Sequence, residues 1–276
     1  MSAYDPTAEG AKMSFAKDMS YIDYLALDPI LGAQNRQSEA HDEMLFIIQH
    51  QTSELWMCLA LHELSVARER LTNGQFPPTF KMLTRVARIF EQLNGAWDVL
   101  RTMTPSEYTE FRADLGSSSG FQSHQYRLIE FMLGNRNRAM LKVHEHRPEL
   151  HHMLTQELGT KSLYHVALDQ LSEQLGTGFS AKVYRMDAPH VSDQAVMEAW
   201  AKVYDDPERF WSLYELAEKL VDLEDYFRRW RFNHVTTVER IIGFKRGTGG
   251  TSGVKYLRRM LEVELFPELW HVRGQL

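Results

Sequence analysis

The strongest constraint on the fold is a stripe of residues spaced alternately four and three apart over residues 207–243. Its members are Leu216, Leu220, Leu223, Phe227, Trp230, His234, Thr237 and Ile241. This spacing places all of them on one side of a long α-helix, which we expect to be buried.

Two further long helices are predicted from the same rhythm. The first covers residues 39–71, ends at Asn73-Gly74, and carries the stripe Leu45, Ile48, Thr52, Leu55, Leu59, His62 and Val66. The second covers residues 78–102 and carries Phe80, Leu83, Val86, Phe90, Leu93, Trp97 and Leu100. Alternating Val-, Ile- and Thr-rich runs are nearly absent, so the predicted fold class is all-α, a bundle of long helices.

The domain organisation follows from length and local composition. A chain of 276 residues with 43% hydrophobic content can bury one large core. We expect a mobile N-terminal arm over residues 1–20 and a single helical domain over residues 21–276. The more polar stretch from about 134 to 206 is predicted to be a small helical insertion.

Charge and cysteine content exclude several classes of protein. The chain has 31 basic and 37 acidic residues, a formal charge of -6, which argues against a nucleic-acid partner or a polybasic membrane anchor. Its single cysteine, Cys58, rules out a disulfide framework and a four-thiolate metal site. No apolar run is long enough to span a bilayer and no secretory signal begins the chain, so a cytoplasmic protein is expected.

Three side chains are candidates for chemistry. His234 interrupts an apolar stripe, where a core histidine with satisfied nitrogens and a metal or haem ligand are the alternatives. His50 lies on another stripe of its helix, near Phe46. Arg112 shares a helical face with Tyr108 and could hold a carboxylate with both arms of its guanidinium, although an exposed arginine lying over aromatic surface is also consistent with the pattern.

The helix that carries Arg112 has a clear start. Thr104, Pro105 and Glu107 form a predicted capping box, and the helix is expected to end near Gly116.

Two segments rich in glycine and serine are hard to explain as packing. Residues 116–123 follow the Arg112 helix, and residues 243–253 follow the His234 helix. The second segment lacks the order of a phosphate-binding P-loop and does not follow a strand, so a loop that closes over a small ligand is the better interpretation. H-E-x-x-H does not occur, which disfavours zinc-protease chemistry.

Residues 41–56, residues 118–123 and the glycine loop around Thr248 together resemble the bacterial, haem-dependent tryptophan 2,3-dioxygenase family. The resemblance extends from about residue 21 to 267 and is faint over 136–207. It implies a helical bundle enclosing haem b, Fe²⁺ in the active form, with His234 as the proximal ligand. It also implies a homotetramer that converts L-tryptophan and O2 to N-formyl-L-kynurenine, the first step of tryptophan catabolism by the kynurenine route.

The same resemblance implies roles for the other candidates. His50 lies near the indole N–H with Phe46 beside it, and Arg112 binds the substrate carboxylate with Tyr108 adjacent. Thr248 meets the substrate ammonium. The remaining implied pocket residues are Ser119 and Gly120 in the serine loop and Tyr21, Tyr24 and Leu25, which complete the pocket of a neighbouring subunit. A haem monooxygenase of a substituted tryptophan and a haem-binding sensor or carrier remain as alternatives.

Overall fold

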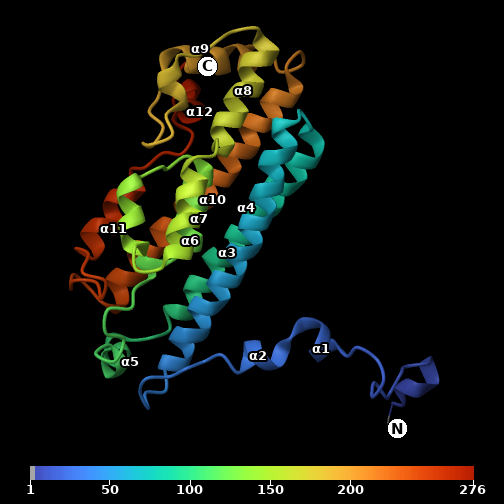
Figure 1. Cartoon of the computed structure of the whole chain (residues 1–276), viewed down its shortest axis with the longest axis vertical. Coiled ribbons are helices and arrows are strands. Elements are labelled where there is room, and N and C mark those ends of the chain that lie inside the picture. Colours follow the sequence, from blue (N-terminus) through green and yellow to red (C-terminus); the bar gives the residue numbers. More distant parts are fainter. Residues whose placement is uncertain (1–3) are drawn as a thin grey trace.

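The computed structural model describes residues 4–276, and within them every regular element is a helix (Figure 1). The α-helices are α1 (Tyr21–Leu25), α2 (Leu27–Leu31), α3 (Glu43–Thr72), α4 (Phe76–Leu100), α5 (Pro105–Phe111), α6 (His124–Leu133), α7 (Pro148–Leu158), α8 (Leu163–Leu175), α9 (Gln194–Asp205), α10 (Trp211–Ile241), α11 (Val254–Leu261) and α12 (Pro267–His271). Five short 3-10 helices, η1 (Pro6–Glu9), η2 (Gly120–Gln122), η3 (Arg138–His144), η4 (Ala181–Tyr184) and η5 (Val272–Gly274), complete the elements. The all-α prediction is confirmed.

The three long helices α3, α4 and α10 form the frame of the molecule (Figure 1). α3 and α4 form a hairpin, because Asn73 caps α3 and Gly74 turns the chain with a left-handed φ of 66°. α4 packs against α3 on one side and against α10 on the other. The frame therefore places the side chains of α4 between the two other long helices.

The predicted stripes of α4 and α10 are confirmed as core. Phe80, Leu83, Val86, Phe90, Leu93, Trp97 and Leu100 are all buried, and so are Leu216, Leu220, Leu223, Phe227, Trp230, Thr237 and Ile241. The rings of Phe90 and Phe227 meet edge to face with centroids 5.1 Å apart. Each fully buried large apolar side chain contributes about 1.5–3 kcal/mol relative to an exposed one, so this double stripe is a major source of stability.

The predicted stripe of α3 is wrong. Ile48, Leu55 and Leu59 are 46%, 57% and 38% exposed, and Thr52 and His62 are exposed as well. The buried side of the helix carries Met57, Ala60, Leu64, Ala67 and Leu71 instead. α3 is apolar on more than one side, so spacing alone could not indicate which side faces the core.

The segment over residues 134–206 carries helices and joins the main core. Tyr164 and Leu168 of α8 and Trp200 of α9 are fully buried in the same cluster as the long helices. Glu268 of α12 links this segment to the C-terminal part of the chain. Its carboxylate accepts hydrogen bonds from Tyr164 Oη (2.8 Å) and from the backbone N–H of Asp193 (2.8 Å).

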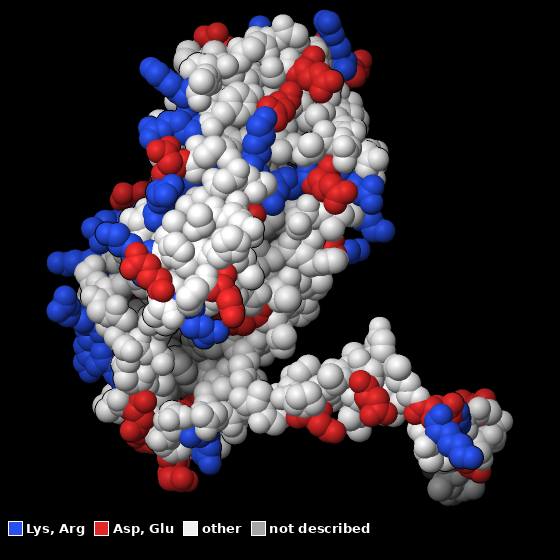
Figure 2. Space-filling view, in the orientation of Figure 1, with Lys and Arg blue, Asp and Glu red and all other residues white. Residues whose placement is uncertain are grey.

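The N-terminal arm extends away from the body of the molecule. η1, α1 and α2 bury no residue, and Figures 1 and 2 show this part of the chain as a projection to one side. It joins the body near Gln34, whose side-chain amide donates to Gln51 Oε1 of α3 (2.8 Å). The first three residues of the predicted arm lie outside the described residues.

Glu43 fixes the point where the arm enters the frame. This buried carboxylate, at the start of α3, accepts from the backbone N–H groups of Gln37 and Ser38, both at 2.8 Å, and from the Ser38 hydroxyl. Burial opposes ionisation, but these hydrogen bonds outweigh it and lower the pKa of Glu43.

None of the helices in residues 4–276 is long and apolar enough to cross a bilayer.

Candidate active site

His234 lies on the inner stripe of α10, about three-quarters of the way along the helix. Its imidazole stacks on the ring of Trp97 from α4, with centroids 4.9 Å apart and planes 16° apart, and touches Trp230 at 5.4 Å. Among residues 4–276 the ring has these aromatic contacts and no hydrogen bond. Desolvation, with a smaller effect of His50, lowers the pKa of His234 to about 4. The imidazole is therefore neutral at pH 7 and has a free lone pair.

His50 is held by its own helix. Its Nδ1 lies 2.7 Å from the carbonyl oxygen of Phe46, one turn earlier on α3, and the two rings are 4.2 Å apart. A carbonyl oxygen only accepts, so the neutral ring carries its proton on Nδ1 and leaves Nε2 as an acceptor. Desolvation lowers the pKa of His50. A positive charge on His50 would also lower the pKa of His234, so the two imidazoles lie within electrostatic reach of each other.

An aromatic wall adjoins His50. Phe46 lies 6.0 Å from Tyr108 and 5.5 Å from Phe111 between ring centroids, and the two α5 rings meet edge to face. Tyr108 and Phe111 are buried because the capping box of Thr104 and Glu107 starts α5 in this position. Phe111 is not among the pocket residues that the family resemblance implies.

Arg112 stands at the end of this wall. The predicted end of its helix near Gly116 is wrong, because α5 stops at Phe111 and a series of turns follows. One Nη2 hydrogen bond goes to the carbonyl oxygen of Arg246 (2.8 Å), while Nε is buried without a partner. A buried, unpaired guanidinium nitrogen is costly. Its presence beside an aromatic wall is consistent with a ligand that supplies an acceptor.

The two segments rich in glycine and serine meet beside Arg112. The hydroxyl of Thr248 donates to the carbonyl oxygen of Ser118, and Ser119 caps η2 by accepting from Phe121 N. A Cβ on Gly249 would lie 2.8 Å from the Cβ of Ser119, so only glycine allows this approach. The loops thus form one wall of the site, and Gly120 lies within it at the start of η2.

The structure brings most of the predicted site residues together but leaves three of them apart. Tyr21, Tyr24 and Leu25 lie on α1 in the projecting arm, exposed by 73%, 75% and 36%, so they do not reach the site of their own chain. Trp97 is a contact that the sequence reasoning missed. Because Trp97 lies in an apolar stripe, its spacing predicted only a core residue and not a stacking contact with His234.

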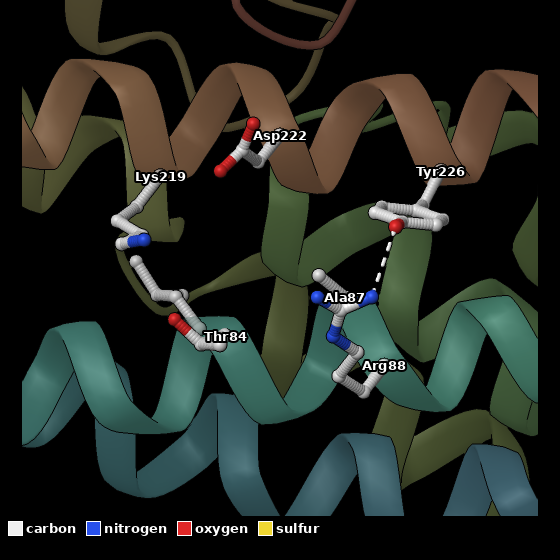
Figure 3. Close-up of a pocket in the computed structure, with 7 residues that line it drawn as sticks. Thr84, Ala87, Arg88, Lys219, Asp222 and Tyr226 are labelled. Carbon is white, nitrogen blue, oxygen red and sulfur yellow. Dashed lines mark hydrogen bonds between the residues drawn. The ribbon is translucent and has the colours of Figure 1, made fainter.

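Two hollows in the surface lie elsewhere, along the groove between α4 and α10. One, of about 230 Å³, is lined by Arg88, Lys219, Asp222 and Tyr226 among others (Figure 3), and the other, of about 330 Å³, lies near Phe232. Neither includes a predicted site residue. Within residues 4–276 no cluster of three or more His, Cys, Asp or Glu side chains could hold a metal ion by itself.

Comparison with known proteins connects this geometry to one family. The family model described as tryptophan 2,3-dioxygenase matches residues 6–176 and 145–276. Similar proteins include the tryptophan 2,3-dioxygenases of Ruegeria pomeroyi (74% identical over 99% of each chain) and of a Ruegeria species, strain TM1040 (67% identical over 100% of this chain and 99% of the relative). A third, from Bradyrhizobium diazoefficiens, is 66% identical over 99% of this chain and 98% of its own. These matches confirm the resemblance seen in the sequence, and the chain belongs to the tryptophan 2,3-dioxygenase family.

Proposed function

We propose that this chain inserts both atoms of O2 across the C2–C3 bond of the indole ring of L-tryptophan, giving N-formyl-L-kynurenine, the first step of tryptophan catabolism by the kynurenine route. The observation that carries the proposal is the meeting of an aromatic wall, an unpaired guanidinium nitrogen and a threonine hydroxyl beside two histidines. Close relatives over the full length are named for this activity.

The residues around His234 fit haem b. The imidazole is neutral at pH 7 and uncommitted, aromatic rings border it, and Trp97 Nε1 is a buried donor without a protein partner. His234 would hold the iron as its proximal ligand. Ferrous haem would supply the binding and activation of O2, with no external reductant consumed in the reaction.

The zwitterionic end of tryptophan fits Arg112 and Thr248. Arg112 has Nε free for a carboxylate, next to an Nη2 that is already oriented by Arg246. The Thr248 hydroxyl donates to Ser118, so its oxygen lone pairs are left to accept from the substrate ammonium. The two contacts would fix the amino-acid end in one orientation, and Ser119 and Gly120, in the same loop wall, would border the indole.

The indole ring fits the wall formed by Phe46, Tyr108 and Phe111. His50 presents Nε2 as an acceptor for the indole N–H, because Nδ1 is committed to Phe46. The N–H is a very weak acid and the pKa of His50 is lowered, so the imidazole positions the ring by a hydrogen bond and does not need to remove the proton. Positioning is the main contribution of the protein.

We propose a homotetramer in which the arm of one subunit completes the pocket of its neighbour. Tyr21, Tyr24 and Leu25 offer exposed apolar surface that their own chain does not cover. The exposed side of α3, with Ile48, Leu55 and Leu59, is a second uncovered apolar surface. Surfaces of this kind mark protein contacts, and closed symmetric assembly would cover them.

The test is the fate of labelled oxygen. Protein reconstituted with haem and reduced is supplied with L-tryptophan and ¹⁸O2, and the product is analysed by mass spectrometry. N-formylkynurenine with two labelled oxygen atoms supports the proposal. One labelled atom in a hydroxylated indole would indicate a monooxygenase, and haem binding without any product would indicate a sensor or carrier.

A further inference from the structure

Arg101, which follows the last turn of α4, contacts the turn of α10 that carries His234. Its Nε donates to Thr237 Oγ1 (2.8 Å), and its Nη2 lies 2.8 Å from Thr236 Oγ1, 2.9 Å from Asn233 Oδ1 and 3.1 Å from the carbonyl oxygen of Asn233. One guanidinium therefore contacts three residues that bracket His234 on both sides.

Asn233 continues this network toward the middle of α4. Its side-chain amide donates to Asn94 Oδ1 (2.9 Å), and Asn94 in turn donates to the carbonyl oxygens of Phe90 (2.8 Å) and Tyr226 (3.1 Å). Between Asn94 and Arg101 lies Trp97, whose ring stacks on His234. Polar contacts thus flank the stacked pair on both sides along α4.

Helix packing alone does not require these contacts. α4 and α10 already pack through buried apolar stripes, and the exposed partner of Arg101, Asp98, forms an ion pair of the kind that contributes little. A planar guanidinium with several fixed donors instead restricts rotation and sliding of the turn that it contacts. The direction in which the imidazole points depends on both motions.

We infer that Arg101, with Asn94 and Asn233, is a positioning device that sets the orientation of the His234 imidazole toward the haem iron. This inference rests on the proposed role of His234 as proximal ligand. It assigns to Arg101 no contact with substrate or iron, since all the hydrogen bonds of its side chain in residues 4–276 are to Asp98 and to the α10 turn.

Arg88 is a matched control on the same pair of helices. Its Nη1 also crosses from α4 to α10, donating to Tyr226 Oη at 3.3 Å as Figure 3 shows, and it also pairs with Glu91 on its own helix. Tyr226 lies two turns before His234, so Arg88→Ala removes an arginine link between the helices without touching the His234 turn.

The experiment compares wild type, Arg101→Ala, Arg101→Lys, Arg88→Ala and His234→Ala, each reconstituted with haem. Resonance Raman spectra of the ferrous, ligand-free proteins give the iron–histidine stretching band, and transfer of haem to excess apomyoglobin gives the rate of haem loss. Arg101→Ala is expected to shift the band and to speed haem loss about tenfold, at the low end for residues that orient a metal ligand. Arg101→Lys should behave like Arg101→Ala, because lysine keeps the positive charge but lacks the planar guanidinium with its several fixed donors.

A lowered melting temperature with an unchanged band and unchanged haem loss in Arg101→Ala would overturn the inference, since Arg101 would then only join two helices. A similar change in Arg88→Ala would overturn it as well. If Arg101→Ala does not fold, Thr237→Val decides, because it removes the acceptor of Nε and should shift the band in the same direction. Failure of the proposed function looks different: the iron–histidine band is missing in wild type or persists in His234→Ala.

Discussion

Replacing Arg112 by methionine tests the recognition of the substrate carboxylate. Nε is free and Nη2 is already oriented by the Arg246 carbonyl oxygen, so a bound carboxylate gains two charge-assisted hydrogen bonds. Such bonds contribute about 1.5–3 kcal/mol each, and the lower end applies because Arg112 is partly exposed. The expected loss of about 3 kcal/mol lowers kcat/KM for L-tryptophan by about a hundredfold.

The assay is steady-state formation of N-formylkynurenine, together with the inhibition constant of tryptamine, which lacks the carboxylate. Arg112→Met should leave the inhibition constant of tryptamine nearly unchanged, while kcat/KM for L-tryptophan falls. Thermal denaturation monitors the lost contact with Arg246. Equal weakening of tryptamine and L-tryptophan would refute the reasoning, since Arg112 would then act on the shape of the pocket and not on the carboxylate.

Three other perturbations follow from the geometry. His50→Ala should retain substantial turnover, since the ring accepts a hydrogen bond and is not an obligatory base; a kcat loss as large as that of His234→Ala at equal haem content would contradict this role. Gly249→Ala should raise KM for L-tryptophan, because its Cβ would lie 2.8 Å from that of Ser119, and an unchanged KM would show that the loops separate without effect. Glu43, with a lowered pKa in the folded state, stabilises the fold above about pH 4.5 and loses this contribution as the pH falls through its folded pKa. In urea denaturation, the free energy of unfolding of Glu43→Gln should therefore fall less steeply than that of wild type as the pH is lowered. An equally steep fall would contradict this role of Glu43.

The sequence was informative where one side of a helix alone is apolar. The stripes of α4 and α10 alternate with charged residues, so their spacing indicated the buried side correctly. α3 carries apolar residues on its exposed side as well, and the wrong stripe was chosen there. The difference is physical, because apolar residues on two sides of a helix give two candidate stripes, and spacing alone does not indicate which one the core covers.

The candidate site was predictable in part. His50 and Arg112 were recognised from their place on a helix and Thr248 from the composition of its glycine-rich segment, and their roles came from the family resemblance. The contacts of Trp97 and Arg101 near His234 were not predicted, because they are with α10, more than a hundred residues away in sequence. Stacking and hydrogen bonds across helices leave no local spacing that a sequence pattern could detect.

The measurement that tests the central claim most directly is the absorbance spectrum of the protein reconstituted with haem, reduced, and then mixed with L-tryptophan and O2. The account predicts a Soret band that depends on His234 and growth of N-formylkynurenine absorbance in the near ultraviolet. A protein that binds no haem, or a Soret band unchanged in His234→Ala, would contradict the account and return His234 to the ordinary core.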